Sequence, residues 1–149
     1  MQKIIAEIGS VHDGKIELAF KLIKKAAYSG ADIIKFQMHL PEFETLKNAP
    51  RPSYFTNEDR FEYFKRTSFT FNQWKKIKKF CESYNVEFMC SPFSVEAVNL
   101  LEKLKVKFYK VPSGELTNIH MLERLKKTKK KILLSTGMSN LEDINNALK

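Results

Sequence analysis

The stretch Tyr109-Lys110-Val111-Pro112-Ser113-Gly114-Glu115 places a cation, a hydroxyl and a carboxylate close together in the chain. Its first residues have the apolar and aromatic character of a β-strand, and the proline, serine and glycine that follow indicate a turn. Parallel α/β proteins place their chemistry at the carboxyl ends of their strands. The stretch therefore predicts such a fold, with a site at the end of this strand.

The same strand-loop-helix unit recurs along the rest of the chain. The segments after the strands carry apolar residues at the spacing of an amphipathic helix, as Leu18, Leu22 and Ala26 do. Five successive units with short exits indicate a parallel sheet with right-handed crossovers. The strands are expected at residues 4–8, 33–37, 86–90, 107–111 and 131–135.

Several predicted helices carry recognisable signals at their ends. Thr70 and Gln73 fit a capping box, and Phe69 with Trp74 fits the hydrophobic staple that accompanies it. Gly30 fits the position just beyond the end of the first helix. Further caps are expected at Ser94 and, as a second capping box, at Ser139 with Glu142.

Polar residues recur at the strand ends and favour a barrel over an open sheet. Lys35 and Gln37 alternate with Ile34 and Phe36, so the two polar side chains share the face that helices do not cover. In a barrel such residues converge at one mouth, and no strand exit contains the G-x-G-x-x-G fingerprint of an open dinucleotide-binding sheet. We therefore predict a TIM (β/α)8 barrel family fold with about five units present, a partial barrel whose first and last strands lack a neighbour.

The connection from residue 39 to residue 68 is longer than most loops in compact domains and is rich in proline and aromatic residues. Its aromatic content argues against disorder. Two interpretations remain open: a loop that covers a substrate, or an ordered excursion with a small core of its own.

The formal charge of +9 permits nucleic-acid binding, but the lysines are scattered over several predicted helices and no nucleic-acid motif is present. A small anionic ligand is compatible with the same charge. Cys81 and Cys90 lack metal-ligand spacing and are expected to be buried thiols. Because Glu7 interrupts the apolar start, the chain resembles neither a secretion signal nor a membrane span, and we expect a cytoplasmic location.

Two lysines on different strands, Lys35 and Lys110, together with the Ser113-Gly114 turn, suit a ligand that carries phosphate or carboxylate. Glu7 and Glu115 could transfer protons or hold sugar hydroxyls. The residue types alone do not choose between these two roles.

Five motifs, in order and covering almost the whole chain, resemble the sialic acid synthases (N-acetylneuraminate synthases). Any one of them alone would be a weak signal. They are residues 4–9 followed by His12-Asp13-Gly14, residues 30–37, Ser91-Pro92-Phe93, residues 109–115, and Leu134-Ser135-Thr136-Gly137-Met138.

The resemblance implies condensation of phosphoenolpyruvate with an N-acyl sugar, such as N-acetylmannosamine, to a nine-carbon 2-keto acid and phosphate, assisted by Mn²⁺ or Mg²⁺. Glu7 would be the catalytic acid nearest the reacting carbons. Gln37 and Glu115 would contact the amino sugar. The residues implied to hold phosphoenolpyruvate are Lys35, Ser91, Lys110, Ser113 and Ser135.

The resemblance also implies that residues 1–149 are the N-terminal part of a longer synthase barrel that works as a homodimer. The later barrel strands, with the metal-binding histidines, and the antifreeze-like domain are expected to be missing. His12, His39 and His120 do not match the metal-binding positions, so no metal ligand is assigned and surface or loop histidines are expected. The alternative is a non-catalytic module that binds anions or phosphosugars.

Overall fold

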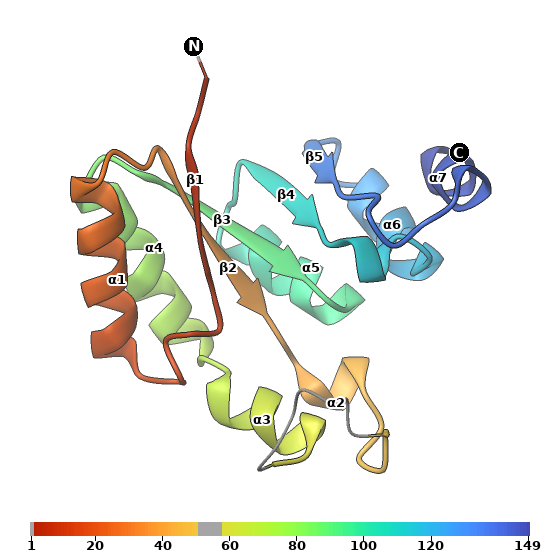
Figure 1. Cartoon of the computed structure of the whole chain (residues 1–149), viewed down its shortest axis with the longest axis horizontal. Helices are drawn as coiled ribbons and strands as arrows, with labels where there is room; N and C mark the ends of the chain where they lie inside the picture. Colours follow the sequence, from red (N-terminus) through yellow and green to blue (C-terminus); the bar gives the residue numbers. More distant parts are fainter. Residues whose placement is uncertain (1, 51–57) are drawn as a thin grey trace.

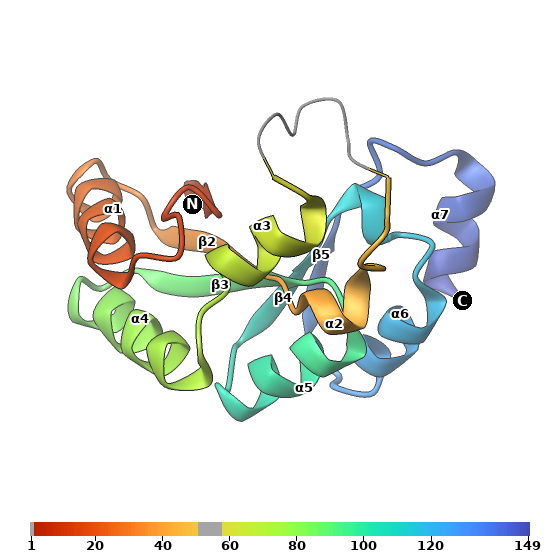
Figure 2. The same cartoon turned by 90° about the horizontal axis from the view of Figure 1, so that it is seen from below.

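The computed structural model describes residues 2–50 and 58–149, which form a curved row of parallel strands with helices on its outer side. Figures 1 and 2 show this arc from two directions. The predicted partial barrel is confirmed. Its strands are β1 (Ile5–Gly9), β2 (Ile33–Met38), β3 (Glu87–Pro92), β4 (Phe108–Val111) and β5 (Lys131–Leu134).

The helices that follow the strands in the five repeating units match the sequence prediction, and two further helices lie within the long connection. These two, α2 and α3, sit at the carboxyl ends of the strands (Figure 2). The helices are α1 (Ile16–Tyr28), α2 (Pro41–Glu44), α3 (Arg60–Thr67), α4 (Phe71–Ser83), α5 (Val95–Lys103), α6 (Ile119–Lys126) and α7 (Leu141–Leu148).

The strands follow the chain order, but they form two hydrogen-bonded ladders. β2 pairs with β1 on one side and β3 on the other, and β4 pairs with β5, all in parallel. β3 and β4 lie side by side without a ladder between them. Within the described chain, β1 and β5 each have one paired neighbour, so the arc is open between them, as predicted for a partial barrel.

The core lies between the strands and the outer helices. Alternate strand residues point into it, among them Ile34, Phe36, Cys90 and Tyr109, all fully buried. Each large apolar side chain buried in this way contributes about 1.5–3 kcal/mol. The opposite face of the strands is therefore left for polar residues.

The predicted capping signals of α1 and α4 are confirmed. Thr70 and Gln73 exchange both hydrogen bonds of a capping box, and the Phe69 and Trp74 rings meet edge to face at 5.1 Å. Gly30, with φ of +87°, ends α1 by donating its N–H to the Ala27 carbonyl. These contacts fix where the two helices start and stop.

The cap predicted at Ser94 is also confirmed, whereas the one predicted at Ser139 is wrong by one residue. The Ser94 side chain accepts the Ala97 N–H. At the start of α7, however, Asn140 and Asp143 form the capping box. Both candidate pairs have the spacing of a capping box, and asparagine is at least as good a cap as serine, so the sequence pattern did not separate them.

Both cysteines are buried free thiols, as predicted. Burial raises the pKa of the Cys81 thiol to about 12 and raises that of Cys90 as well. Neither is a reactive thiolate at neutral pH.

The described part of the 39–68 connection is an ordered excursion with a small core. Phe61 and Phe64 of α3 are buried, and the His39 ring is stacked between Phe64 and Phe93, with centroids 3.8 and 4.0 Å away. Residues 51–57 lie outside the described residues, so the alternative of a substrate-covering loop stays a prediction there.

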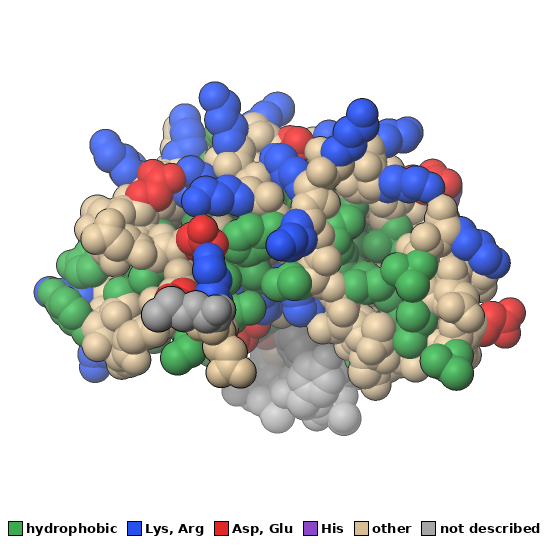
Figure 3. All heavy atoms as spheres, turned by 90° about the horizontal axis from the view of Figure 1, so that it is seen from above, with side chains coloured by type: hydrophobic (Ala, Val, Ile, Leu, Met, Phe, Trp, Pro, Cys, Tyr) green, Lys and Arg blue, Asp and Glu red, His purple; other side chains and the backbone are tan. Residues whose placement is uncertain are grey.

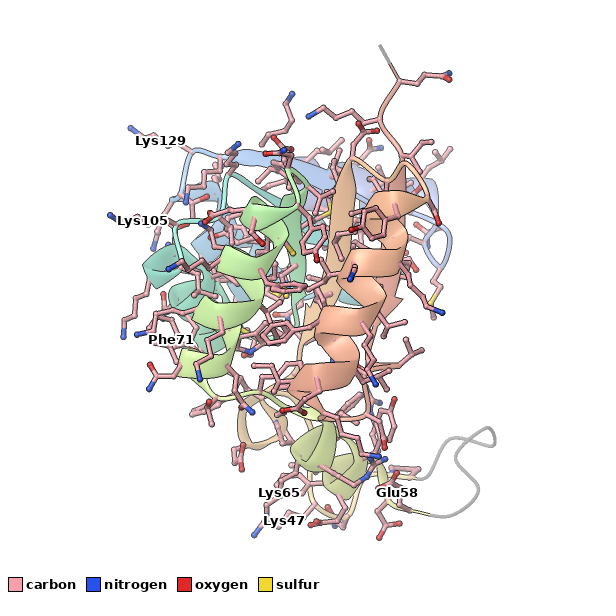
Figure 4. The ribbon with its side chains drawn as sticks, turned by 90° about the vertical axis from the view of Figure 1, so that its left-hand side faces the viewer. Lys47, Glu58, Lys65, Phe71, Lys105 and Lys129 are labelled. Carbon is pink, nitrogen blue, oxygen red and sulfur yellow. The ribbon has the colours of Figure 1, made fainter. Side chains whose placement is uncertain are left out.

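The excursion and the turns before the strands lie at opposite ends of the molecule. Figure 4 shows Lys47, Glu58 and Lys65 at the end formed by the excursion, and Lys105 and Lys129 at the other end. Across the described ranges 2–50 and 58–149, we find no helix with the length and apolar character needed to cross a membrane.

Candidate functional site

Five of the predicted site residues share the inner face of the strands. Glu7 is aligned with Lys35 across β1 and β2, and Gln37 is aligned with Ser91 across β2 and β3. Lys110 lies between Tyr109 and Val111, whose side chains are buried on the helix side, so its own side chain points inward. The alternation predicted from the sequence is confirmed.

Lys35 is the centre of this group. Only 9% of the residue is exposed, its ammonium pairs with the Glu7 carboxylate, and its Nζ lies 3.5 Å from Ser91 Oγ. A buried charge is stable only when it is paired and hydrogen-bonded. The Glu7 side chain is half exposed, so the pair lies at the edge of an open space.

Lys110 extends the positive charge to the next strand. Its Nζ donates a hydrogen bond to its neighbour's carbonyl, Val111 O, at 3.0 Å. Burial lowers the pKa of Lys110, repulsion from Lys35 lowers it further, and attraction to Glu7 acts in the opposite direction. The two ammonium groups are therefore close enough to repel each other.

Ser135 and Lys110 donate to the same carbonyl, whereas Ser113 has no hydrogen bond to that carbonyl among the described residues. The Ser135 N–H donates to Val111 O at 3.0 Å, the same carbonyl that accepts from Lys110. Ser113 is half-buried at the start of the 3-10 turn Ser113–Glu115 that follows β4. Within residues 2–50 and 58–149, no hydrogen bond joins either serine hydroxyl to Lys35 or Lys110.

Gln37 is held against the loop that follows β1. Ser10 Oγ donates to Gln37 Oε1 at 3.5 Å, a contact that the sequence did not predict. Gly9 has φ of +53°, and a Cβ at this position would lie 3.4 Å from Glu7 Oε1 and 3.5 Å from Gln37 Oε1. Both are ordinary van der Waals contacts, so the positive φ, not a lack of space, favours glycine here.

Glu115 belongs to a second cluster, formed with the 39–68 excursion. Asn118 Nδ2 donates to Glu115 Oε2 at 2.8 Å. Burial raises the pKa of the Glu115 carboxyl and repulsion from Glu44 raises it further, while the Asn118 hydrogen bond, His39 and Arg60 lower it. Glu115 is therefore close enough to the excursion for the charges of Glu44 and His39 to act on it.

His39 and Glu44 form the inner part of this second cluster. His39 Nδ1 lies 2.8 Å from Glu44 Oε1, and both side chains are 5% exposed. His39 is a loop histidine, within the prediction of a surface or loop position, and stacking on two aromatic rings buries it. Glu44 was missed altogether, since a glutamate near the end of a short helix carries no distinctive sequence signal.

His12 is likewise a loop residue but not a surface one. It is 1% exposed, stacks on Phe69 at 4.3 Å between ring centroids, and accepts the Gly14 N–H on Nδ1 at 3.2 Å. Burial lowers its pKa to about 4. His120 on α6 is exposed, as predicted.

The described residues do not fit the divalent metal that the resemblance implies. His39 is committed to its aromatic stack and to Glu44, and His120 lies on an outer helix. His12 stacks on Phe69 and accepts the Gly14 N–H on Nδ1, so only its buried Nε2 has no partner among the described residues. Among residues 2–50 and 58–149, no group of three His, Cys, Asp or Glu side chains is arranged to hold a metal ion.

Comparison with known proteins finds relatives that align with almost the whole of this chain. The chain is 38% identical over 150 aligned positions to the N,N'-diacetyllegionaminic acid synthase of Campylobacter jejuni, a match that covers 97% of this chain and 45% of the relative. It is 31% identical to the N-acetylneuraminate-9-phosphate synthase of Homo sapiens, over 93% of this chain and 40% of the relative.

A solved structure matches in shape as well. The N-acetylneuraminic acid (sialic acid) synthetase of Leptospira borgpetersenii superposes with a TM-score of 0.84 and 28% identity, over 97% of this chain and 48% of that one. The chain thus spans less than half the length of these relatives. The model of the NeuB family matches residues 22–149, and the chain accordingly belongs to the NeuB family.

Proposed function

We propose that the chain supplies the phosphoenolpyruvate-binding part of a sialic-acid-type synthase. The complete enzyme would condense phosphoenolpyruvate with an N-acyl sugar to a nine-carbon 2-keto acid and release phosphate. The observation that carries the proposal is Lys35, buried between Glu7 and Ser91 with Lys110 close enough to repel it. Two cations beside one carboxylate leave a net positive site on the inner face.

An anion would relieve the repulsion between the two lysines. The phosphate and carboxylate of phosphoenolpyruvate would each accept charge-assisted hydrogen bonds from Lys35 and Lys110. Ser91, which already contacts Lys35, would add a directed hydroxyl donor. We propose that Ser113 and Ser135 contribute further donors from the turns after β4 and β5.

Glu7 is the carboxylate nearest this charge. Its half-exposed side chain is within reach of a ligand bound at Lys35, so it could hold or move a proton at the reacting carbons. We propose Gln37, beside it on β2, and Glu115 as contacts for the sugar. The Mn²⁺ or Mg²⁺ implied by the resemblance, the cytoplasmic location and the homodimer stay predictions.

A second candidate function is a non-catalytic module that binds anions. The open arc between β1 and β5 favours it, because the inner face carries the lysines while part of the barrel wall is missing from the described chain. Nucleic-acid binding ranks last, since it gives no role to the polar side chains that the strands bring together on the inner face.

Isothermal titration calorimetry of the chain with phosphoenolpyruvate tests the proposed binding site. We expect Lys35→Met and Lys110→Met each to weaken binding about tenfold or more, because each removes a charge-assisted hydrogen bond. Lys76→Met, which removes the same charge from an exposed position on α4, is the matched control and should bind as the parent does. Absence of binding by the folded parent, or equal affinity in all variants, would contradict the proposal.

A further inference from the structure

The His39–Glu44 pair has no role in the phosphoenolpyruvate site. It lies on the excursion, where His39 is clamped between Phe64 and Phe93 and holds one oxygen of Glu44 at 2.8 Å. The ring is therefore fixed in orientation, and it fixes the carboxylate in turn. A carboxylate that a neighbouring residue holds in one orientation is typical of a binding or catalytic site.

The other carboxylate oxygen, Glu44 Oε2, is buried and has no hydrogen-bond partner among the described residues. The side chain is only 5% exposed, so water does not freely replace the missing partner. Buried polar atoms are almost always hydrogen-bonded, and an unsatisfied one needs an explanation. A ligand that donates a hydrogen bond would supply it.

The charge of Glu44 acts on Glu115. It raises the pKa of the Glu115 carboxyl, whereas His39 and Arg60 act in the opposite direction. Glu115 is itself held in place by Asn118 Nδ2 at 2.8 Å. Two carboxyl groups, one from the excursion and one from the turn after β4, are thus each held by a hydrogen-bonding partner and lie close enough to interact.

The two clusters carry charges of opposite sign, so they suit different ligands. Lys35 and Lys110 attract an anion, whereas Glu44 and Glu115 repel one. Carboxylate oxygens only accept hydrogen bonds, so the second cluster suits hydroxyl and amide N–H donors. We therefore expect an uncharged ligand rich in such donors.

We propose that Glu44, oriented by His39, is a specificity-determining residue that accepts a hydrogen bond from a hydroxyl or amide N–H group of the uncharged amino sugar. It would act opposite Glu115, so that the excursion forms one wall of the sugar subsite. This inference rests on the proposed function, because it assigns the second substrate of the same reaction. His39 is a positioning residue that acts through Glu44.

The test compares two ligands on the same variants. The chain is titrated with N-acetyl-D-mannosamine in the presence of phosphoenolpyruvate, and separately with phosphoenolpyruvate alone. Glu44→Gln should weaken N-acetyl-D-mannosamine binding about tenfold and leave phosphoenolpyruvate binding unchanged, because hydrogen bonds to a charged group are worth about that factor. Glu42→Gln, the same change at an exposed position of the same helix, should alter neither.

A second variant separates orientation from folding. His39→Phe preserves the stack between Phe64 and Phe93 but removes the ring nitrogen that holds Glu44, so it should weaken sugar binding and leave phosphoenolpyruvate binding intact. In Glu44→Gln, an NMR titration of the Glu115 carboxyl should show a lower pKa than in the parent, because the repelling charge is gone. If Glu44→Gln does not fold, the sugar affinity of His39→Phe tests the proposed role of Glu44 instead.

The two proposals fail in different ways. A folded parent chain that does not bind phosphoenolpyruvate contradicts the proposed function. A parent that binds phosphoenolpyruvate but not N-acetyl-D-mannosamine overturns the inference about Glu44 alone. So does undiminished sugar affinity in the folded Glu44→Gln variant, or in His39→Phe where Glu44→Gln does not fold.

Discussion

Lys35 illustrates how a single side chain sets the character of the site. Its ammonium is almost completely buried, and removing a charge from water is unfavourable unless a counter-ion is near. Glu7 supplies that counter-ion from the neighbouring strand, and Ser91 lies on the other side. Lys110 then adds a second positive charge. Among the described residues of the inner face, no carboxylate forms an ion pair with Lys110, so the site favours binding of an anion.

His12 makes the stability of the chain depend on pH. Its pKa is about 4 in the folded state and 6.5 in the unfolded state, so the unfolded chain takes up the proton first as the pH falls. The contribution of the neutral, buried ring to stability is fully present above pH 6.5 and is lost as the pH falls towards 4. It amounts to about 3 kcal/mol.

Urea unfolding at pH 7 and pH 4 measures this effect. We expect the decrease in unfolding free energy between the two pH values to be smaller by about 3 kcal/mol in His12→Gln than in the parent. The exposed His120→Gln should show the same decrease as the parent. An equal decrease in the parent and His12→Gln would rule out His12 as the source.

At the scale of elements, the excursion is coupled to the first barrel loop. Asp13, after β1, forms an ion pair with Arg66 of α3, and Arg66 also pairs with Glu58. Gly14, with φ of +72°, brings its backbone so close to the Arg66 carbonyl that a Cβ would collide with it. The loop beside Glu7 and Gln37 and the helix that leads out of the excursion are thus fixed relative to each other.

The start of α7 gives a prediction at the same scale. Asn140→Ala should destabilise this helix by about 1 kcal/mol, because it removes the side-chain acceptor of the Asp143 N–H. Ser139→Ala should have little effect. Amide hydrogen exchange of residues 141–148 measures the local change directly, and faster exchange in Ser139→Ala but not in Asn140→Ala would place the cap one residue earlier.

At the scale of the molecule, the two ends of the arc have different characters. Figure 3 shows lysine and arginine side chains around an apolar centre at the end where the strands begin. This hollow is lined by Ile5, Ile33 and Phe108, with Lys3, Lys107 and Lys131 beside them. The candidate site lies towards the carboxyl ends of the strands, so the lysines around this hollow are separate from Lys35 and Lys110.

The open arc predicts the behaviour of the isolated chain. We expect residues 1–149 to lack condensing activity with phosphoenolpyruvate, N-acetylmannosamine and Mn²⁺, because five strands enclose the site on one side only. A discontinuous assay for the 2-keto acid product measures this. Product formed at a rate well above that of a Lys35→Met, Lys110→Met double variant would show that the five units suffice.

Much of this architecture could be predicted because it depends on local sequence. The alternation that places Lys35 and Gln37 on one face and Phe36 on the other is a property of any strand. The capping box at Thr70 acts over one helical turn. The one error among the caps, at Ser139, arose where two local signals of similar strength overlapped. The roles of the site residues in binding and catalysis stay predictions.

The sequence by itself determined the order of the five strands and of the helices that alternate with them, the inward face of the strands and the family resemblance, because these follow from periodicity and from motifs along the chain. Only the tertiary structure decided that Glu115 is grouped with Glu44 and His39 rather than with Lys110, only five residues away in sequence. The reason is physical. Burial and Coulomb interactions depend on distances in space, and the excursion brings residues 39–44 to a turn some seventy positions later in the chain.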